Sequence, residues 1–232
     1  MKYILTDVEG TTTSISFVHD TLFPFAKARL KDYVSRNLTS STVRESLNST
    51  KATVFEETQK TINDTEAVEQ LLTWIAEDRK HPALKSLQGH IWEEGYSSGE
   101  IKGHVYEDVP IALKAWKDAG LKLGVYSSGS VKAQHLIFEF STAGNLRPYF
   151  SHHFDTAVGH KREKHSYLNI INQLNLPADQ ILFLSDIKEE LDAAKEAGMN
   201  TIQLVRQDDV ILGRHSQVKN FLDIDLEAPP KI

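Results

Sequence analysis

The sequence predicts a doubly wound α/β protein with a mostly parallel sheet and a helical segment inserted after the first strand. Short apolar, β-compatible runs recur, at residues 3–6, 121–127, 180–186 and 201–205. Such runs are typical of buried parallel strands. Helical patterns separate the later runs, and this alternation indicates a doubly wound sheet. Residues 17–100 break the rhythm, because they contain successive helical patterns and no convincing strand.

The helices of the expected sheet domain follow from apolar spacing and from residues that begin or end helices. They cover residues 109–120, 131–140, 165–175 and 189–198. Asp108 is placed to cap the first helix, and Gly120 and Gly198 are placed to end the first and the last. This part of the chain therefore reads as strand and helix in alternation.

The inserted segment reads as a cap made of helices. Asn63 followed by Glu66 predicts a capping box, and Pro82 is expected to begin a further helix. The glycines within 95–103 mark the return of the chain to the sheet. We therefore predict a core domain formed by residues 1–16 and 101–232 and a helical cap formed by residues 17–100.

Composition excludes several classes of function and location. The net charge of −6 and the lack of a long basic run argue against a nucleic-acid partner. The chain has no cysteine, which excludes disulfides, thiolate zinc sites and thiol nucleophiles. Residues 1–14 leave no room for a signal peptide, and no run approaches the roughly 18 apolar residues of a membrane span. We expect a cytoplasmic monomer with no membrane association.

Polar side chains follow three of the predicted strands at the points where ligands collect in open α/β sheets. They are Asp7 after the first strand, Ser127 and Ser128 after the second, and Ser185 and Asp186 after the run at 180–186. Lys161 lies in the loop GHKRE, before a predicted helix. These residue types suit a phosphate and metal site, because a carboxylate can attack phosphorus when a hard cation offsets the charge repulsion.

The residues suggest a division of roles within such a site. Asp7 would attack phosphorus, and Asp7 and Asp186 would bind Mg²⁺, with Glu190 as a further candidate. The serine hydroxyls and Lys161 would hold the other phosphate oxygens.

Each of these residues also has a simpler interpretation. Asp186 could merely cap the helix that follows it, and Lys161 could be a solvated loop lysine. The sequence SSGS at 127–130 could be a turn, and the threonines at 11–13 could only close a loop. The chain carries an acid, a serine, a lysine and an acid in this order, each directly after a strand or in a loop before a helix. This combination favours one common site over four unrelated residues.

The order of these residues resembles the four motifs of the haloacid dehalogenase-like hydrolase superfamily. The motifs are Asp7-x-Glu9-Gly10-Thr11, then Ser127, then Lys161, then Asp186 with an acid four residues later. The segments DVEGTTTSISFVHD, LQGHIWEEGY, YSSGSVKAQ, GHK and FLSD are similar to the acireductone synthase, or enolase-phosphatase, family of methionine salvage. Glu9 makes this resemblance specific, because most members of the superfamily carry aspartate there.

The resemblance implies a Rossmann-like core of the haloacid dehalogenase type and an enzyme with one Mg²⁺ per chain. Its substrate would be 2,3-diketo-5-methylthiopentyl 1-phosphate, which is enolised and then dephosphorylated through an aspartyl-phosphate to the acireductone 1,2-dihydroxy-3-keto-5-methylthiopentene. The implied residues are Asp7 and Glu9 for catalysis, Asp7, Glu9 and Asp186 for the metal, and Ser127, Ser128 and Lys161 for the substrate.

Glu9 raises a question about the two half-reactions. Its extra methylene, compared with aspartate, could let one carboxyl group serve both the phosphate ester oxygen and the carbon that loses a proton. The alternative is that Glu9 only adjusts the geometry of the metal site.

Other functions remain open at this point. A generic sugar phosphatase is the nearest enzymatic alternative. A phosphorylated signalling receiver uses similar residues but lacks a helical insert after its first strand, and a non-catalytic binding domain could share the fold. A zinc site is conceivable at His152, His153, His160 and His165, although their spacing is not that of a metalloprotease helix.

Two further regions carry weaker expectations. Gln88, Trp92 and Tyr96 recur at helical spacing in the cap and could line one side of a methylthioalkyl pocket. The segment after Arg206 matches no motif, and we expect it to be loosely structured.

Overall fold

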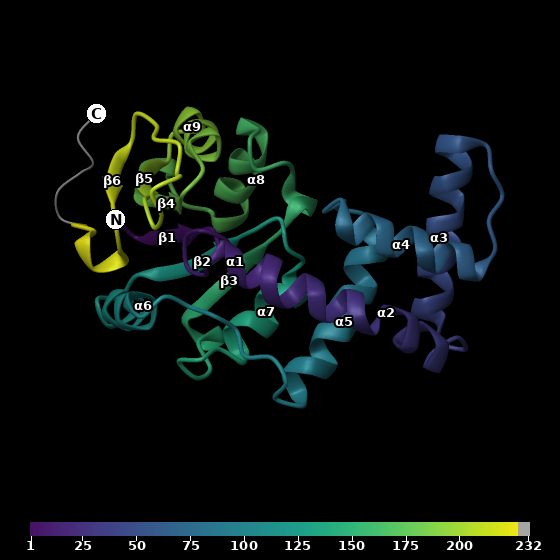
Figure 1. Ribbon diagram of the computed structural model, residues 1–232. Coiled ribbons are helices and arrows are strands. Elements are labelled where there is room, and N and C mark those ends of the chain that lie inside the picture. The colour runs from purple at the N-terminus through teal and green to yellow at the C-terminus, as the bar shows by residue number, and fades with distance from the viewer. Residues whose placement is uncertain (227–232) are drawn as a thin grey trace. The chain divides into compact units, whose positions relative to one another are not determined.

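Six parallel strands form one sheet in the computed structural model, which describes residues 1–226 (Figure 1). The strand order is β3-β2-β1-β4-β5-β6. The strands are β1 (Tyr3–Thr6), β2 (Lys122–Tyr126), β3 (Phe150–Phe154), β4 (Ile181–Ser185), β5 (Asn200–Leu204) and β6 (Ser216–Val218). Because β1 pairs with β2 and with β4, the loop after β1 lies between the loops of two neighbouring strands. The predicted α/β fold class is confirmed.

The chain divides into two compact units. One unit contains Met1–Ile15 and Lys102–Ile232 and holds the sheet, and the other contains Ser16–Ile101 and is helical. The assignment of the two units as a catalytic core and a cap stays a prediction. Residues 227–232, which the predicted core includes, lie outside the described part of the chain.

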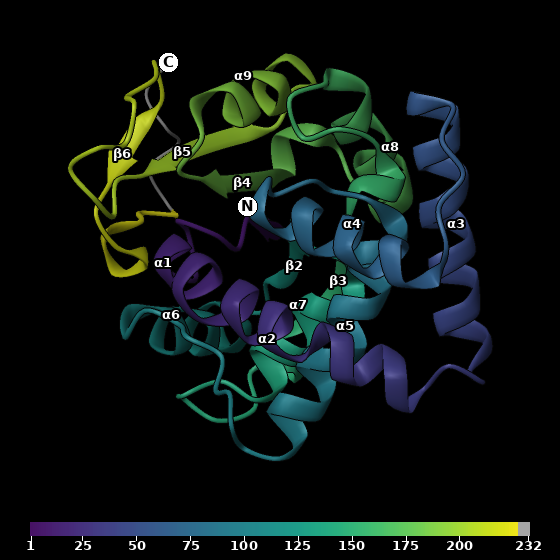
Figure 2. The same ribbon diagram turned by 45° about the vertical axis from the view of Figure 1, so that its right-hand side comes forward.

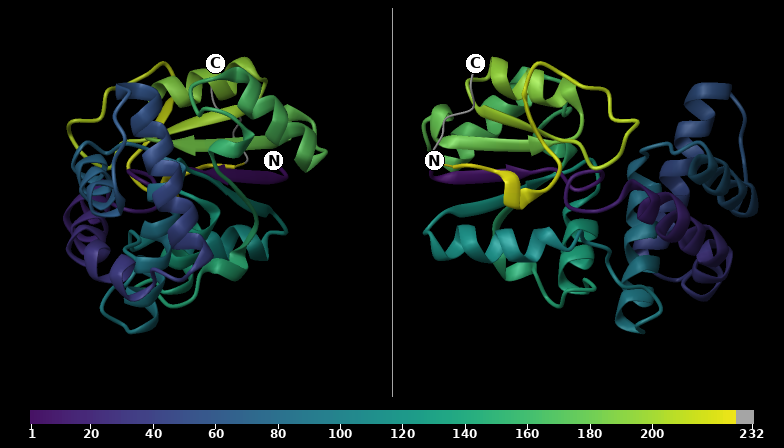
Figure 3. Two further views of the ribbon diagram at one scale, coloured as in Figure 1. Left: turned by 90° about the vertical axis from the view of Figure 1, so that its right-hand side faces the viewer. Right: turned by 60° about the vertical axis from the view of Figure 1, so that its left-hand side comes forward.

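Helices cover both faces of the sheet. α6 (Asp108–Asp118) and α7 (Val131–Glu139) lie on one face, and α8 (Lys164–Leu174) and α9 (Lys188–Glu196) lie on the other (Figures 1 and 3). Short 3₁₀ turns complete this unit, at η2 (Arg147–Tyr149), η3 (Thr156–Val158), η4 (Ala178–Gln180) and η5 (Phe221–Asp223).

The face under α8 and α9 shows why these strands are buried. Tyr3 and Leu5 alternate along β1 onto this face, where they join a cluster with Tyr167 and Ile170 of α8 and Leu191 of α9. Each of these five side chains is fully buried. Burial of a large apolar side chain contributes roughly 1.5–3 kcal/mol, so this cluster helps to fix the end of β1.

The helical unit begins within the short helix α1 (Ile15–Phe17) and continues through a π-helical turn, η1 (Val18–Leu22). Its longer helices are α2 (Phe23–Arg36), α3 (Ser41–Thr58), α4 (Asp64–Ala76) and α5 (Pro82–Ser97), seen from another side in Figure 2. The capping box at the start of α4 is confirmed, with hydrogen bonds in both directions between Asn63 and Glu66. α5 begins at Pro82, as predicted.

Trp92 has a structural role inside this helical unit. Its indole Nε1 donates to the carbonyl oxygen of Leu22 at 2.8 Å, and its side chain is buried. α5 packs against α2 and α3, which accounts for the burial of its apolar stripe. The expectation that Gln88, Trp92 and Tyr96 line a substrate pocket stays a prediction, and all three side chains are buried.

Two strands were not predicted. β3 has the sequence FSHHF, in which only the two phenylalanines are buried, so it lacks a continuous apolar run. β6 has three residues, none fully buried, and is recognised only by its parallel pairing with β5.

Two expectations about the ends of elements were wrong. Asp108 does not cap α6 with its side chain, because its carboxylate is paired with Arg206. The segment after Arg206 is not loose as far as residue 226, because it forms β6 and η5 and buries Phe221. Among residues 1–226 no helix is long and apolar enough to cross a membrane.

Candidate active site

The loop after β1 presents Asp7 at the carboxyl end of the sheet. The backbone N–H of Asp7 still donates to the Leu184 carbonyl of β4 at 2.9 Å, so its position is fixed by the sheet. The chain then turns tightly, because the Val8 carbonyl accepts hydrogen bonds from the N–H groups of Thr11 and Thr12. Asp7 is therefore a side chain on a rigid turn, with 4% of its side chain exposed.

Gly10 makes this turn possible and brings it against a second acid. Its φ is +75°, a value that residues with a side chain rarely adopt. A Cβ at this position would collide with Oδ2 of Asp186. The turn and Asp186 are thus in close contact, and only glycine fits between them.

Lys161 is a buried cation that faces two carboxylates. Its Nζ lies 2.6 Å from Oδ1 of Asp7 and 2.7 Å from Oε2 of Glu190, and 5% of its side chain is exposed. The hydroxyl of Tyr167 donates to the Lys161 carbonyl at 2.7 Å and so fixes the backbone at this point. The simpler interpretation of Lys161 as a solvated loop lysine is wrong.

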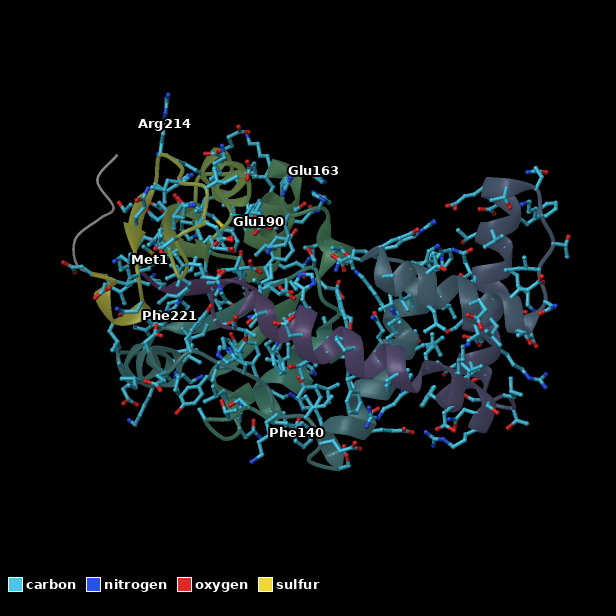
Figure 4. All side chains as sticks on the ribbon, in the orientation of Figure 1. Met1, Phe140, Glu163, Glu190, Arg214 and Phe221 are labelled. Atoms are coloured by element: carbon cyan, nitrogen blue, oxygen red, sulfur yellow. The ribbon has the colours of Figure 1, made fainter. Side chains whose placement is uncertain are left out.

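Glu190 was only a marginal candidate in the sequence. It lies on α9, in the unit that holds the sheet, and Figure 4 labels it. The hydroxyl of Ser185 donates to its Oε2 at 3.0 Å and accepts from the N–H of Ile187 at 3.1 Å. The spacing of Glu190, four residues after Asp186, identified it as a candidate for the metal, whereas its ion pair with Lys161 was not predicted.

Asp186 follows β4 and has no capping role. The residue before α9 is Ile187, so the interpretation of Asp186 as a simple helix cap is wrong. Its backbone N–H donates to Oγ1 of Thr11 at 3.1 Å, which links the two loops again. Its Oδ1 atom is buried and has no hydrogen-bond partner among the described residues.

Ser127, which follows β2, contacts Glu9 of the loop after β1. The hydroxyl of Ser127 donates to Oε2 of Glu9 at 3.1 Å and accepts from the N–H of Gly129 at 2.9 Å. Ser130 caps α7, since its side chain accepts from the N–H of Ala133. Ser128 lies beside Ser127 and is half-buried, and its contact with substrate stays a prediction.

The electrostatics of the site follow from an excess of acids. Burial raises the pKa of Asp7 well above its usual value, Lys161 opposes this rise, and the charges of Glu190, Glu9 and Asp186 add to it. Burial also raises the pKa of Asp186 to about 6, with its own backbone hydrogen bond opposing. Burial alone would lower the pKa of Lys161, but the carboxylates of Asp7 and Glu190 raise it instead. The site therefore favours the binding of additional positive charge.

The acidic side chains of the site could supply some, but not all, of the ligands of a metal ion. Residues 1–226 contain no group of three or more His, Cys, Asp or Glu side chains arranged to hold one. The buried Oδ1 of Asp186 nevertheless lacks a partner that a cation would supply, and the turn carrying Asp7 lies against Asp186. Mg²⁺ often takes only one or two carboxylates and completes its shell with water and phosphate, so two acids suffice.

The histidines singled out in the sequence have other surroundings. Nδ1 of His152 lies 3.0 Å from the Tyr3 hydroxyl, and Nδ1 of His153 lies 3.1 Å from Oε1 of Gln134. Both residues belong to β3, within the sheet.

A cavity of about 310 Å³ opens beside Asp186 in the same unit. Its wall combines cationic and apolar side chains with Gly10 of the β1 turn. The lining includes Arg162, Lys188 and Arg206 and the apolar residues Ile15, Ile187, Val210 and Ile211.

Several known proteins are similar to this chain over most of its length. The family model described as haloacid dehalogenase-like hydrolase matches residues 1–198. The chain is 49% identical over 226 residues to the Enolase-phosphatase E1 of Pectobacterium carotovorum, with 97% of each chain covered. It is similar to the crystal structure of the UTR4 protein from Saccharomyces cerevisiae, with a TM-score of 0.79, 34% identity, and 96% and 99% of the two chains covered. A dehalogenase structure at 17% identity and a TM-score of 0.55, covering 96% of this chain and 94% of its own, shares the fold.

Proposed function

This chain belongs to the enolase-phosphatase E1 family of haloacid dehalogenase-like hydrolases, and we propose that Asp7 is the nucleophile of its phosphatase reaction. The protein is accordingly an enolase-phosphatase of methionine salvage that acts on a phosphorylated small molecule. The observation that carries the nucleophile assignment is the buried ion pair between Asp7 and Lys161, at 2.6 Å. Lys161 holds the Asp7 carboxylate in place and offsets its charge.

The proposed substrate is 2,3-diketo-5-methylthiopentyl 1-phosphate, once it has been enolised. An oxygen of Asp7 attacks phosphorus, the ester P–O bond breaks, and the product oxygen takes a proton from Glu9. Water then attacks phosphorus of the aspartyl-phosphate while Glu9 takes a proton from it. The acyl phosphate bond breaks, inorganic phosphate leaves and the Asp7 carboxylate is restored.

The remaining polar residues hold the phosphate during these steps. Lys161 offsets charge on the phosphate as well as on Asp7, and Ser127 and Ser128 donate hydrogen bonds to its oxygens. Ser127 has a single hydroxyl proton, which donates to Oε2 of Glu9 at 3.1 Å in the structure and would turn to a phosphate oxygen when the substrate binds.

Phosphatases of this superfamily typically use Mg²⁺, and we propose one ion per chain, held by Asp7 and Asp186 with Glu9 beside it. Bound there, the ion would offset the negative charge of the phosphate as Asp7 approaches. The buried Oδ1 of Asp186, which has no partner among the described residues, supports this proposal.

For the enolase step, we propose that Glu9 also removes the proton from the carbon next to the substrate carbonyl. The electron pair of the C–H bond then forms the C=C bond, and the former carbonyl oxygen takes a proton from water. Glutamate has the reach to approach this carbon, which lies about one bond beyond the ester oxygen. The same carboxyl group would then serve the ester oxygen, so one side chain would connect the two half-reactions.

The variant Asp7→Asn tests the nucleophile. We expect a folded protein without phosphate release from the methylthio diketone phosphate, because an amide cannot attack phosphorus. Asp118→Asn, at an exposed acid paired with Lys114, is the matched control and should keep full activity. Capture of a phosphoryl or beryllium fluoride adduct on any residue other than Asp7 would contradict the assignment.

The same assay separates the proposal from a generic sugar phosphatase. Phosphate release is compared between sugar phosphates and the methylthio diketone, and ultraviolet absorbance follows the enol product. Preference for a sugar phosphate without any enol signal would favour the alternative. A cytoplasmic location and a monomeric state also stay predictions, and light scattering during gel filtration would test the second.

A further inference from the structure

Arg206 follows β5, in a part of the chain to which the sequence assigned no function. Its Nε donates to the Thr11 carbonyl at 3.1 Å. Its two terminal nitrogens donate to the two carboxylate oxygens of Asp108, both at 2.8 Å. Only 5% of the Arg206 side chain is exposed. Such a two-pronged, buried pair fixes both the position and the plane of a guanidinium.

Two aromatic rings and a backbone carbonyl also contact this guanidinium. Its central carbon lies 4.3 Å from the ring centroid of Tyr106 and 5.2 Å from that of Phe221. The N–H of Phe221, a residue labelled in Figure 4, donates to Oδ2 of Asp108 at 2.6 Å. The terminal nitrogen of Arg206 that donates to Oδ1 of Asp108 also donates to the Lys219 carbonyl, at 3.3 Å. The segment after β6 therefore holds Arg206 and Asp108 together.

Thr11 connects this buried pair to the site. Its carbonyl accepts from Arg206, and its Oγ1 accepts from the N–H of Asp186. Thr11 belongs to the same turn as Glu9, and its side chain is fully buried. A shift of Arg206 would thus move the turn and the Asp186 backbone together.

Gln203, a residue of β5, contacts the loop that carries Asp186. The side-chain amide of Gln203 donates to the Asp186 carbonyl at 2.8 Å and to the Ile211 carbonyl at 2.9 Å. Its oxygen accepts from the N–H of Gly213 at 2.8 Å. Gln203 at the end of β5 therefore contacts the Asp186 loop, and Arg206 just after β5 contacts the loop after β1.

We propose that Arg206 is a positioning residue of the phosphoryl-transfer site. Through Thr11 it fixes where Glu9 and Asp186 lie relative to Asp7, and Asp108, Tyr106 and Phe221 hold Arg206 in place. The inference rests on the proposed function of Asp7 and Asp186. It gives residues 206–221 a part in the reaction, although none of them is proposed to touch the reacting atoms.

The variants Arg206→Lys and Arg206→Ala test this role. Lysine keeps the charge but cannot pair with both oxygens of Asp108 while also reaching Thr11. We expect kcat for a simple phosphate ester to fall about 10- to 100-fold, while KM changes by less than about threefold, because residues that orient ligands typically have effects of this size. Calorimetric titration with Mg²⁺ in the absence of substrate should show an affinity about tenfold weaker.

Controls separate positioning from a general loss of structure. Arg147→Ala removes an exposed arginine of the same unit, paired with Glu139 at 2.9 Å, and should change neither kcat nor Mg²⁺ affinity. Thr11→Val removes only the hydroxyl that accepts from Asp186, so it should weaken Mg²⁺ binding even if Arg206→Ala does not fold. The double variant Asp108→Asn with Arg206→Ala should lower kcat by less than the product of the two single fold-changes, because both substitutions remove the same interaction.

The outcomes distinguish this inference from the function it rests on. Unchanged kcat and Mg²⁺ affinity in folded Arg206→Lys or in Thr11→Val would overturn the positioning role and leave the nucleophile assignment intact. Full activity of Asp7→Asn would instead overturn the nucleophile, whatever Arg206 does.

Discussion

At the scale of single residues, the site places several carboxyl groups around one buried cation. Lys161 neutralises part of the charge of Asp7 and Glu190, and both of its ion pairs are nearly inaccessible to water. Removing one partner of a buried ion pair costs about 3–5 kcal/mol, because the charge that remains has no compensation. Lys161 therefore contributes to stability, and in the proposed reaction we expect it to contribute to catalysis as well.

Lys161→Met should lose both rate and substrate affinity. The methionine keeps the length of the side chain but leaves the carboxylates of Asp7 and Glu190 unpaired and the phosphate without its cation. We expect kcat to fall at least about 100-fold, KM to rise, and the free energy of unfolding to fall by about 3–5 kcal/mol. Steady-state kinetics and urea unfolding measure these changes, with Lys164→Met at an exposed site as the control. A variant that loses stability but keeps wild-type kinetics would leave Lys161 with a structural role only.

Glu9→Asp tests whether one carboxyl group serves both half-reactions. The shorter side chain loses reach toward the substrate carbon and also the contact of Oε2 with the Ser127 hydroxyl, now 3.1 Å. We expect enolisation, followed by ultraviolet absorbance, to slow about tenfold more than hydrolysis of a simple phosphate ester that needs no enol. Equal losses with both substrates would leave Glu9 as a residue of the metal site alone.

At the scale of the elements, the turn after β1 depends on Gly10. We expect Gly10→Ala to lower kcat by more than about tenfold, because the new methyl group must displace Asp186 or move the turn. Gly120→Ala is the matched control, since Gly120 has a φ of +82° and open space around it. This control should cost only about 1 kcal/mol in unfolding free energy and leave kcat unchanged. Equal kinetic effects of the two substitutions would show that backbone strain alone matters, not the contact with Asp186.

The elements that the sequence predicted are those with a strong local pattern. β1, β2, β4 and β5 carry apolar runs, and the acids and serines that follow them could be recognised from their place after a strand. β3 and β6 were not predicted from the sequence. They are strands because they pair with β2 and β5, and such pairing cannot be recognised in a short stretch of sequence. The contact between Arg206 and Thr11 joins residues 195 positions apart, and no spacing rule predicts it.

At the scale of the whole molecule, a half-buried histidine, His153, links stability to pH. Burial lowers the pKa of His153 to about 4, and the charges of His135, Arg147 and His152 add to the effect. Because the unfolded chain binds a proton near pH 6.5 and the folded chain does not, folding stability should be lost as the pH falls from about 6.5 toward 4.

His153→Gln should reduce this loss. Urea unfolding at pH 7 and pH 5 compares the variant with the wild type. The difference attributable to His153 should be about 1 kcal/mol, a value reduced for solvent screening because the ring is partly exposed. His165→Gln, at an exposed position, should keep the pH dependence of the wild type. An unchanged pH dependence in His153→Gln would show that other groups carry it.

The central place of β1 in the sheet also affects the order in which contacts form while the protein is being synthesised. β1 ends at Thr6, but its two partners begin only at Lys122 and Ile181, and Ser16–Ile101 are synthesised before either partner exists. Contacts between distant parts of a chain form late, because closing a long loop costs entropy before any contact offsets it. On the ribosome we therefore expect the contacts among α2, α3, α4 and α5 to form while β1 is still unpaired. The strand that precedes the proposed nucleophile therefore leaves the ribosome before the helical unit and before both of its neighbours, and it pairs only after they have been made.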